Sequence, residues 1–214
     1  MASWIRRSFT SPGLTQIPPG PHLGKLQGKY GGGTVMLCID VSGSMDGKPL
    51  TEAVRGARTF VVEAAEARYK VGVVLWDHEV VDLEEPTADP KRALRLLDRA
   101  RSRGATNLLP ALDLTHKVLD RFKGDPDRVV AIFGDGDLGP RDDVLAKVAR
   151  MKAEDIRFVT RGLGYAAAQE FAEISSEEDT QVEVGGVDDL AESIAGMATA
   201  LKGRARRKKL GLGR

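Results

Sequence analysis

The sequence is poor in cysteine and histidine, and it lacks any long apolar run. Cys38 is the single cysteine, which excludes an internal disulfide and a zinc cluster built from cysteines, so a reducing cytoplasm is the compartment we expect. No stretch of about 18 consecutive apolar residues occurs, and we therefore predict no membrane-spanning helix. Pro12 stands where an apolar segment would have to follow Arg6-Arg7, so no export signal is expected.

Acidic residues are absent from both ends of the chain. Residues 1–33 carry four basic side chains and residues 202–214 carry seven, whereas the whole chain has a net charge of +1. The body between them, residues 34–201, therefore has a net charge of about −10. The proline- and glycine-rich first segment predicts an extended basic arm, the body a globular domain, and the last segment a flexible basic tail.

Short apolar runs alternate with amphipathic stretches along the body. The amphipathic stretches repeat apolar residues at spacings of three and four, which is the period of a helix with one buried face. This alternation predicts an α/β fold: a doubly wound, mostly parallel, six-stranded sheet with helices on both faces. The predicted strands are residues 34–40, 70–76, 79–83, 128–133, 156–161 and 181–184. The predicted helices include residues 53–64, 94–97, 112–119, 144–151 and 190–197.

One connection in this pattern is too short for a helix. Only Asp77 and His78 separate the second predicted strand from the third. Parallel strands need a crossover of a dozen or more residues, so these two strands are expected to form an antiparallel hairpin at one edge of the sheet.

Three polar segments are predicted at the carboxyl edge of the sheet, where folds of this class bind ligands. The first is Asp40-Val41-Ser42-Gly43-Ser44, directly after the first strand. The others are Gly104-Ala105-Thr106-Asn107 and Gly134-Asp135-Gly136. Side chains alternate in an extended segment, so Asp40, Ser42 and Ser44 are expected to point to one side.

The oxygen atoms of these segments suit a hard divalent cation. Mg²⁺ takes about six oxygen ligands at roughly 2.0–2.1 Å and usually keeps some waters. The two serines, Thr106 and the carboxylates of Asp40 and Asp135 would supply such a shell. Mg²⁺ is therefore the predicted ion, and Mn²⁺ or Ca²⁺ would suit the same ligands.

These residues resemble the von Willebrand factor A domain with its metal-ion-dependent adhesion site. Residues 40–44 match the D-x-S-x-S motif of the family, and Thr106 and Asp135 match its later threonine and aspartate in order and spacing. The similarity covers residues 34–200. One departure is Gly134, where the family often has Thr or Ser, and that position is not a required ligand.

The resemblance implies that Ser42, Ser44 and Thr106 coordinate the metal directly, whereas Asp40 and Asp135 act largely through water. Neutral ligands leave the cation electrophilic, and in the family a Glu or Asp of a partner protein completes the coordination. The resemblance thus implies a binding module, not an enzyme. Cytoplasmic members often work beside AAA+ ATPases, as in magnesium chelatase and the MoxR-associated proteins, so we expect an adaptor or scaffold in a multi-protein complex.

Two other chemistries fit the motifs less well. A serine nucleophile needs a base within hydrogen-bond reach, but His22 lies in the arm, His78 in the hairpin turn and His116 within a helix. Residues 134–139 match G-x-G-x-x-G, the pattern of a dinucleotide-binding loop. Two carboxylates inside that loop would repel a pyrophosphate.

Two alternative functions stay open beside the adaptor. A metal-activated hydrolase would need a base near the ion, for which Asp46 and Asp137 are the candidates. A binder of nucleic acid or of an anionic surface would act through the basic tail, which lacks aromatic residues that stack on bases. Trp4 and Phe9 favour docking of the arm on a partner or on its own domain.

Overall fold

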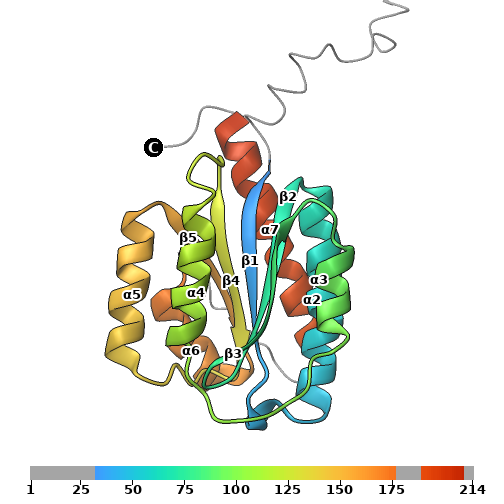
Figure 1. Cartoon of the computed structure of the whole chain (residues 1–214), viewed down its shortest axis with the longest axis vertical. Coiled ribbons are helices and arrows are strands. Elements are labelled where there is room, and N and C mark those ends of the chain that lie inside the picture. The colour runs from blue at the N-terminus through green and yellow to red at the C-terminus, as the bar shows by residue number, and fades with distance from the viewer. Residues whose placement is uncertain (1–31, 177–188, 210–214) are drawn as a thin grey trace, which may run out of the picture.

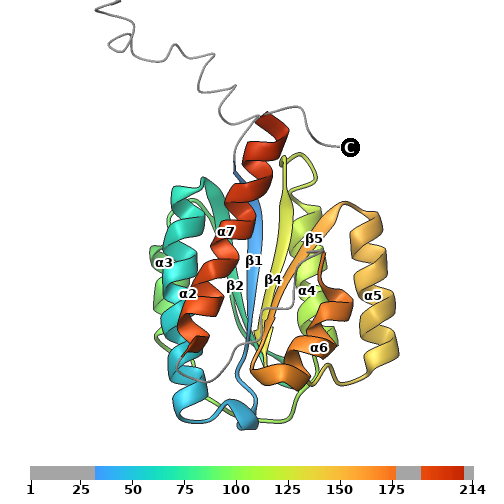
Figure 2. The same ribbon diagram turned by 180° about the vertical axis from the view of Figure 1, so that it is seen from behind.

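The computed structural model describes residues 32–176 and 189–209, which Figures 1 and 2 show from opposite sides. Most of the predicted arm, the sixth predicted strand and residues 210–214 lie outside these ranges. The elements in chain order are β1 (Gly33–Asp40), η1 (Gly43–Met45), α2 (Lys48–Glu66), β2 (Tyr69–Trp76), β3 (Val80–Thr87), α3 (Lys91–Leu97), α4 (Leu109–Asp120), β4 (Arg128–Gly134), α5 (Arg141–Ala153), β5 (Ile156–Gly162), α6 (Gly164–Ile174) and α7 (Leu190–Lys209).

The described strands form one mixed sheet in the order β3-β2-β1-β4-β5. β1 pairs in parallel with β2 and β4, and β4 pairs in parallel with β5. β3 is an edge strand that pairs with β2 in the antiparallel direction, which confirms the predicted hairpin. Strand order runs outward from β1 in both directions, so the sheet is doubly wound, as predicted.

Two features of the prediction differ from the structure. The described residues form five strands where six were expected, because the predicted strand at 181–184 lies outside them. The prediction also omits α6, although its buried residues Ala167, Phe171 and Ile174 follow the helical spacing of four and three. Glycines at 162 and 164 stand where this helix begins and are typical of a loop, which weakens the helical pattern.

Two apolar cores cover the two faces of the sheet. Every residue of β1 is buried, and its successive side chains point to opposite faces. Val35, Leu37 and Ile39 pack in the core with α2, α3 and α7, whereas Met36 and Cys38 pack in the core with α4, α5 and α6. Figure 2 shows α7 crossing β1, and Figure 1 shows α4 and α5 on the other face. A strand buried on both faces is almost wholly apolar, and here that apolar run ends at the carboxyl edge.

Three loops lie at the carboxyl edge of the sheet, the lower end in Figure 1. They are the first loop (residues 41–47), the second loop (residues 98–108) and the third loop (residues 135–140). Together with the last residues of β1 and β4, Asp40 and Gly134, they contain the three polar segments that the sequence places at this edge. The fold therefore positions the candidate site here.

The opposite, amino edge holds the start of β1 and the end of α7. The hydroxyl of Tyr69, the first residue of β2, lies 3.4 Å from the Leu201 carbonyl oxygen of α7. α7 continues to Lys209, so it includes residues 202–209 of the predicted tail. The described helices include none that combines the length and the apolar character needed to cross a membrane.

Candidate metal centre

The first loop places two serines beside the carboxylate at the end of β1. Asp40 has no exposed surface. The backbone N–H of Ser42 donates to Asp40 Oδ1 at 2.8 Å, so the chain turns immediately after the strand. Ser42 Oγ lies 3.0 Å from Ser44 Oγ. The alternate side chains of this segment therefore meet.

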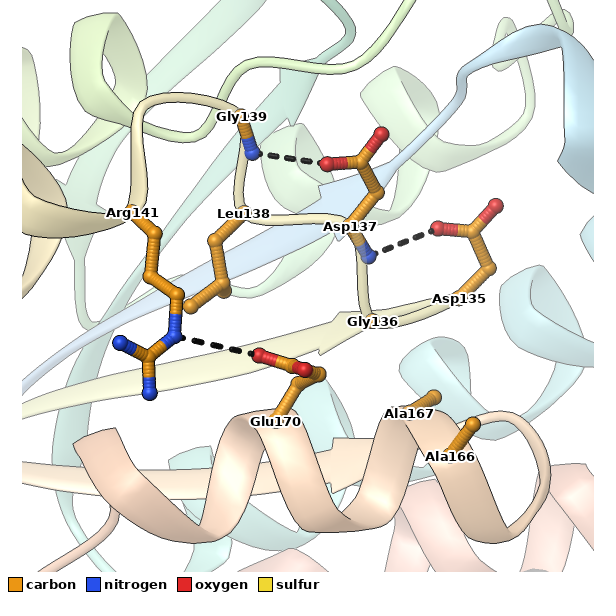
Figure 3. A pocket seen from close by; sticks show the side chains of 9 residues that line it. All are labelled: Asp135, Gly136, Asp137, Leu138, Gly139, Arg141, Ala166, Ala167 and Glu170. Atoms are coloured by element: carbon orange, nitrogen blue, oxygen red, sulfur yellow. Dashed lines mark hydrogen bonds and ion pairs between the residues drawn. The ribbon is translucent and has the colours of Figure 1, made fainter.

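The third loop brings a second carboxylate to the same serines. β4 runs parallel to β1 and ends one residue before Asp135. Ser44 Oγ donates to Asp135 Oδ2. The backbone N–H of Asp137 donates to Asp135 Oδ1 at 3.3 Å and holds this carboxylate from the other side (Figure 3). Asp40, Ser42, Ser44 and Asp135 thus form one connected group.

The second loop, which carries Thr106, is bonded to the first. The Gly43 N–H donates to the Gly104 carbonyl oxygen at 3.0 Å, and Ser102 Oγ donates to the Ser42 carbonyl oxygen at 3.1 Å. Thr106 follows two residues after Gly104 and is partly exposed. These bonds fix the backbone on which Thr106 lies against the segment with the two serines.

The second loop also contacts the third. The Leu108 N–H donates to the Leu138 carbonyl oxygen at 3.3 Å. A Cβ atom at Gly139 would lie 3.2 Å from the Thr106 carbonyl oxygen, so the third loop passes close beside Thr106. The three loops therefore contact one another pairwise, and the residues predicted to hold a metal lie at one edge of the sheet.

The Asp40 carboxylate is incompletely satisfied. Its Oδ2 is buried and has no hydrogen-bond partner within the described residues. Burial raises the pKa of Asp40 from 3.8 to about 6, hydrogen bonds from Ser42 lower it, and the nearby charge of Asp135 raises it. A buried carboxylate with an unpaired oxygen and a second carboxylate close by favours a bound cation.

The glycine at the end of β4 leaves room for this oxygen. A Cβ atom at Gly134 would lie 2.9 Å from Asp40 Oδ2 and 3.2 Å from the ring of Phe171. A side chain at this position would therefore displace the Asp40 carboxylate or the phenylalanine ring. This close approach is a physical reason for glycine at the position where the sequence departs from the family that it resembles.

The two described histidines face acids. Nε2 of His116 lies 3.1 Å from Glu154 Oε2, and Nδ1 of His78 lies 3.2 Å from Asp77 Oδ1. A serine nucleophile would need one of these imidazoles as its base. Their positions do not support that chemistry.

The third loop is also a poor phosphate cradle. The N–H of Asp137 donates to Asp135, and the N–H of Gly139 donates to Asp137 Oδ1 at 2.8 Å (Figure 3). A phosphate-binding loop would offer such N–H groups to the ligand. Here the carboxylates of the loop itself accept them, so the geometry opposes dinucleotide binding.

A cavity of about 380 Å³ opens beside the third loop and is lined in part by Asp135. α6 forms one wall, and its Glu170 Oε2 lies 3.6 Å from Nε of Arg141, the first residue of α5 (Figure 3). The close approach of α6 requires glycine at 136, because a Cβ atom there would lie 2.3 Å from Ala167 Cα and the φ angle is +100°. The cavity is therefore continuous with the candidate centre.

Sequence reasoning missed one buried acid at this edge. Asp77 follows β2 and has no exposed surface, yet the prediction assigns it only to the hairpin turn. An acid directly after a buried strand is the same signal that singles out Asp40 and Asp135. Arg103, which pairs with Asp77 at 3.2 Å, carries no comparable signal because arginines are frequent in loops.

Comparison with known protein families supports this fold. Residues 35–137 match the model of the von Willebrand factor type A domain. The matched segment begins in β1 and ends in the third loop, so it includes all five predicted metal ligands. No curated protein matches the chain.

Several solved structures share the fold at low sequence identity. The vWF domain of the type V pili tip protein Mfa5 from Porphyromonas gingivalis is 12% identical with a TM-score of 0.69, over 86% of this chain and 97% of that chain. A von Willebrand factor type A structure from Catenulispora acidiphila is 18% identical with a TM-score of 0.66, over 81% of this chain and 43% of that chain. BatB from Bacteroides thetaiotaomicron is 16% identical with a TM-score of 0.62, over 80% of this chain and 99% of that chain.

Proposed function

We propose that the protein binds a partner protein through a divalent cation, because residues 35–137 match the von Willebrand factor type A domain, a kind of domain that commonly mediates protein interactions. The cation captures an Asp or Glu side chain of the partner. Mg²⁺ is the proposed ion because every proposed ligand atom is a hard oxygen, and Mn²⁺ or Ca²⁺ suits the same ligands. The proposed ligands are Asp40, Ser42, Ser44, Thr106 and Asp135.

The unpaired oxygen of Asp40 is the observation that carries the proposal. A buried carboxylate is normally paired with a positive group or coordinates a metal. Around Asp40, the bonded group of side chains consists of two serine hydroxyls and the carboxylate of Asp135. A cation with its bound waters would give the free oxygen a partner and would offset both negative charges.

The exposure of the ligands indicates where a partner would approach. Asp40 is fully buried and Ser42 is 1% exposed, whereas Ser44 is exposed. The hydroxyls of Ser42, Ser44 and Thr106 would contact the ion directly, and the two carboxylates would act largely through water. When bound, the ion supplies the positive charge that attracts the carboxylate of the partner, which reaches it from the side of Ser44.

We further propose that the protein is an adaptor or scaffold in a multi-protein complex, with a MoxR-like AAA+ ATPase as a candidate partner. This assignment rests on analogy with the family. The cavity next to Asp135 supports a protein partner, because it leaves room for the residues that flank the partner's carboxylate.

A hydrolase at the same site is less well supported. Asp137 Oδ1 accepts a hydrogen bond from the Gly139 N–H, which directs this acid into its own loop. Asp46, the other candidate base, is exposed one residue after η1. Binding through the basic tail gains no support from the part of the chain that the structure describes.

Affinity capture with the full chain tests the proposal. The immobilised protein is incubated with cell extract in Mg²⁺ or in a chelator, and the retained proteins are identified. We expect partners that are retained in Mg²⁺, released by the chelator and lost on Asp40→Ala, because the cation links the two proteins. A titration with Mn²⁺ followed by electron paramagnetic resonance should show at least about tenfold weaker binding by Asp40→Ala.

Asp113→Ala is the matched control. Asp113 lies on α4 outside the three loops and pairs with Lys147 of α5 at 2.6 Å. This variant should keep both Mn²⁺ and the partners. Partners retained equally in chelator and by Asp40→Ala would refute the proposal, and partners lost only on deletion of residues 203–214 would point to the basic tail.

A further inference from the structure

The second loop is held by a buried carboxylate that belongs to none of the three loops. Asp77 follows β2 directly and has no exposed surface. Its N–H donates to the Glu79 carbonyl oxygen at 3.0 Å, and the Glu79 N–H donates to Asp77 Oδ1 at 2.9 Å. These bonds close the turn between β2 and β3 and thereby fix the direction of Asp77 Oδ2.

Asp77 contacts the second loop on both sides of Thr106. Arg103 Nε donates to Asp77 Oδ2 at 3.2 Å. At Gly104 the backbone passes so close that a Cβ atom would lie 2.5 Å from this oxygen, and the φ angle of +72° also requires glycine. On the other side of Thr106, the Asn107 N–H donates to the Asp77 carbonyl oxygen at 2.9 Å.

The anchored segment is also the one that bonds to the first loop. The Arg103 N–H donates to the Val41 carbonyl oxygen at 2.8 Å, and the Gly104 carbonyl oxygen accepts from the Gly43 N–H at 3.0 Å. Gly43 lies between the two candidate serine ligands. A displacement of Asp77 would therefore move Thr106 relative to the serines.

We propose that Asp77 is a positioning residue that sets the place of Thr106 at the metal centre and thereby the affinity for the cation. This inference rests on the proposed function. Mg²⁺ demands nearly ideal octahedral geometry, so a small shift of one ligand weakens binding. Asp77 acts through the second loop, because its carboxylate is already engaged by Arg103 and by the Glu79 N–H.

A second ion at Asp77 is a less suitable explanation of this cluster. The ligand atoms of Asp77, His78 and Glu79 lie within 4.8 Å of one another, close enough to share a cation. Arg103, however, pairs with both acids at 3.2 Å and already supplies the positive charge. The cluster is therefore assigned to the anchoring of the second loop.

Asp77→Asn tests the inference in the full chain. The variant keeps the size of the side chain and an acceptor for the Glu79 N–H, but it replaces the acceptor of Arg103 with an NH₂ group. We expect the dissociation constant for Mn²⁺, measured by electron paramagnetic resonance, to rise about tenfold. Glu85→Gln removes the same charge from the same hairpin at an exposed side chain that pairs with Arg121, outside the second loop, and it should change the constant less than about twofold.

A double-mutant cycle separates positioning from general destabilisation. In a Thr106→Ala background, Asp77→Asn should cost almost no further Mn²⁺ affinity, because the ligand that it positions has been removed. An equal loss with and without Thr106 would overturn the inference. Unchanged affinity in the Asp77→Asn variant would overturn it as well.

Arg103→Gln is the second variant if Asp77→Asn fails to fold. The Arg103 side chain is 52% exposed, so its replacement should leave the fold intact. It should weaken Mn²⁺ binding in the same direction, and unchanged affinity would count against the inference. Failure of the proposed function would look different, because wild type and Asp40→Ala would then not differ in Mn²⁺ binding.

Discussion

Asp127 and Asp40 are buried aspartates at opposite edges of the same sheet, and their surroundings differ. Asp127 precedes β4 at the amino edge, where its Oδ2 accepts hydrogen bonds from the Tyr69 hydroxyl at 2.7 Å and from Arg157 at 2.8 Å. Asp40 ends β1 at the carboxyl edge. Burial and the charge of Asp135 raise its pKa, and its Oδ2 has no partner within the described residues.

This difference separates a structural acid from a candidate ligand. The chain itself supplies the cation and the hydroxyl that balance Asp127. At Asp40 the chain supplies hydrogen bonds to one oxygen and a second negative charge. Burial alone therefore does not mark a functional acid, whereas burial without compensation does. The following experiments test whether the two acids really differ in this way.

Of the substitutions considered, Asp127→Ala is expected to change the free energy of unfolding most. It removes the carboxylate that pairs with Arg157, whose side chain is only 15% exposed, so the free energy of unfolding should fall by about 3–5 kcal/mol. Urea denaturation in the presence of chelator measures this change. Asp113→Ala is the control, because Asp113 pairs with Lys147 in a half-exposed position and should cost at most about 1 kcal/mol. An equal loss of unfolding free energy in the two variants would mean that Asp127 is no more important for stability than a surface acid.

Saturation with Mg²⁺ should produce the next largest effect. An ion that binds only the folded state at a hundred times its dissociation constant stabilises it by about 2.7 kcal/mol. Urea denaturation should show this gain in the wild type and the same gain in Asp113→Ala. Asp40→Ala should gain at most about 1.4 kcal/mol at the same Mg²⁺ concentration, because its affinity is expected to be at least about tenfold weaker. A gain of equal size in Asp40→Ala would place the ion elsewhere on the protein.

Asp40→Asn should have the smallest effect, with the opposite sign to Asp127→Ala. In chelator the substitution removes an uncompensated buried charge, so the free energy of unfolding should rise by about 1 kcal/mol. The same denaturation experiment measures it, and Mg²⁺ should no longer stabilise the variant. A marked loss of stability in chelator would mean that the charge of Asp40 is compensated within the fold.

Most of the fold follows from local patterns. Four of the five described strands agree closely with predicted segments because each is a short apolar run, and the hairpin follows from a connection too short for a helix. β3 continues to Thr87, four residues beyond its predicted end, through Glu84 and Glu85. α6 could not be predicted as readily, since its packing depends on Gly136 and Gly162, which admit the helix backbone at close range. These close contacts form only in the tertiary structure. In the sequence alone, the same glycines indicate a loop.

The candidate site likewise combines features that follow from the local sequence with features that depend on tertiary contacts. The meeting of Ser42 with Ser44 follows from the alternation of side chains, which is a local property. The contribution of Asp77 depends on the approach of Gly104, and the free oxygen of Asp40 depends on the absence of a side chain at Gly134. Both contacts join residues that are far apart in the sequence. They could therefore not be predicted without knowing how the strands are arranged in the sheet.

β1 and α7 place the start of the first strand and the end of the last helix at the edge opposite the candidate metal centre and its three loops, as Figure 1 shows. The first strand starts at Gly33, and Leu201 in the middle of the last helix lies 3.4 Å from the Tyr69 hydroxyl. A strand of 8 residues spans about 26 Å. A protein attached at the amino edge would therefore be separated, by about the length of β1, from a partner bound through the proposed ion. The domain would act as a spacer between the two. Attachment to a sensor surface through either end would likewise leave the metal centre facing solution.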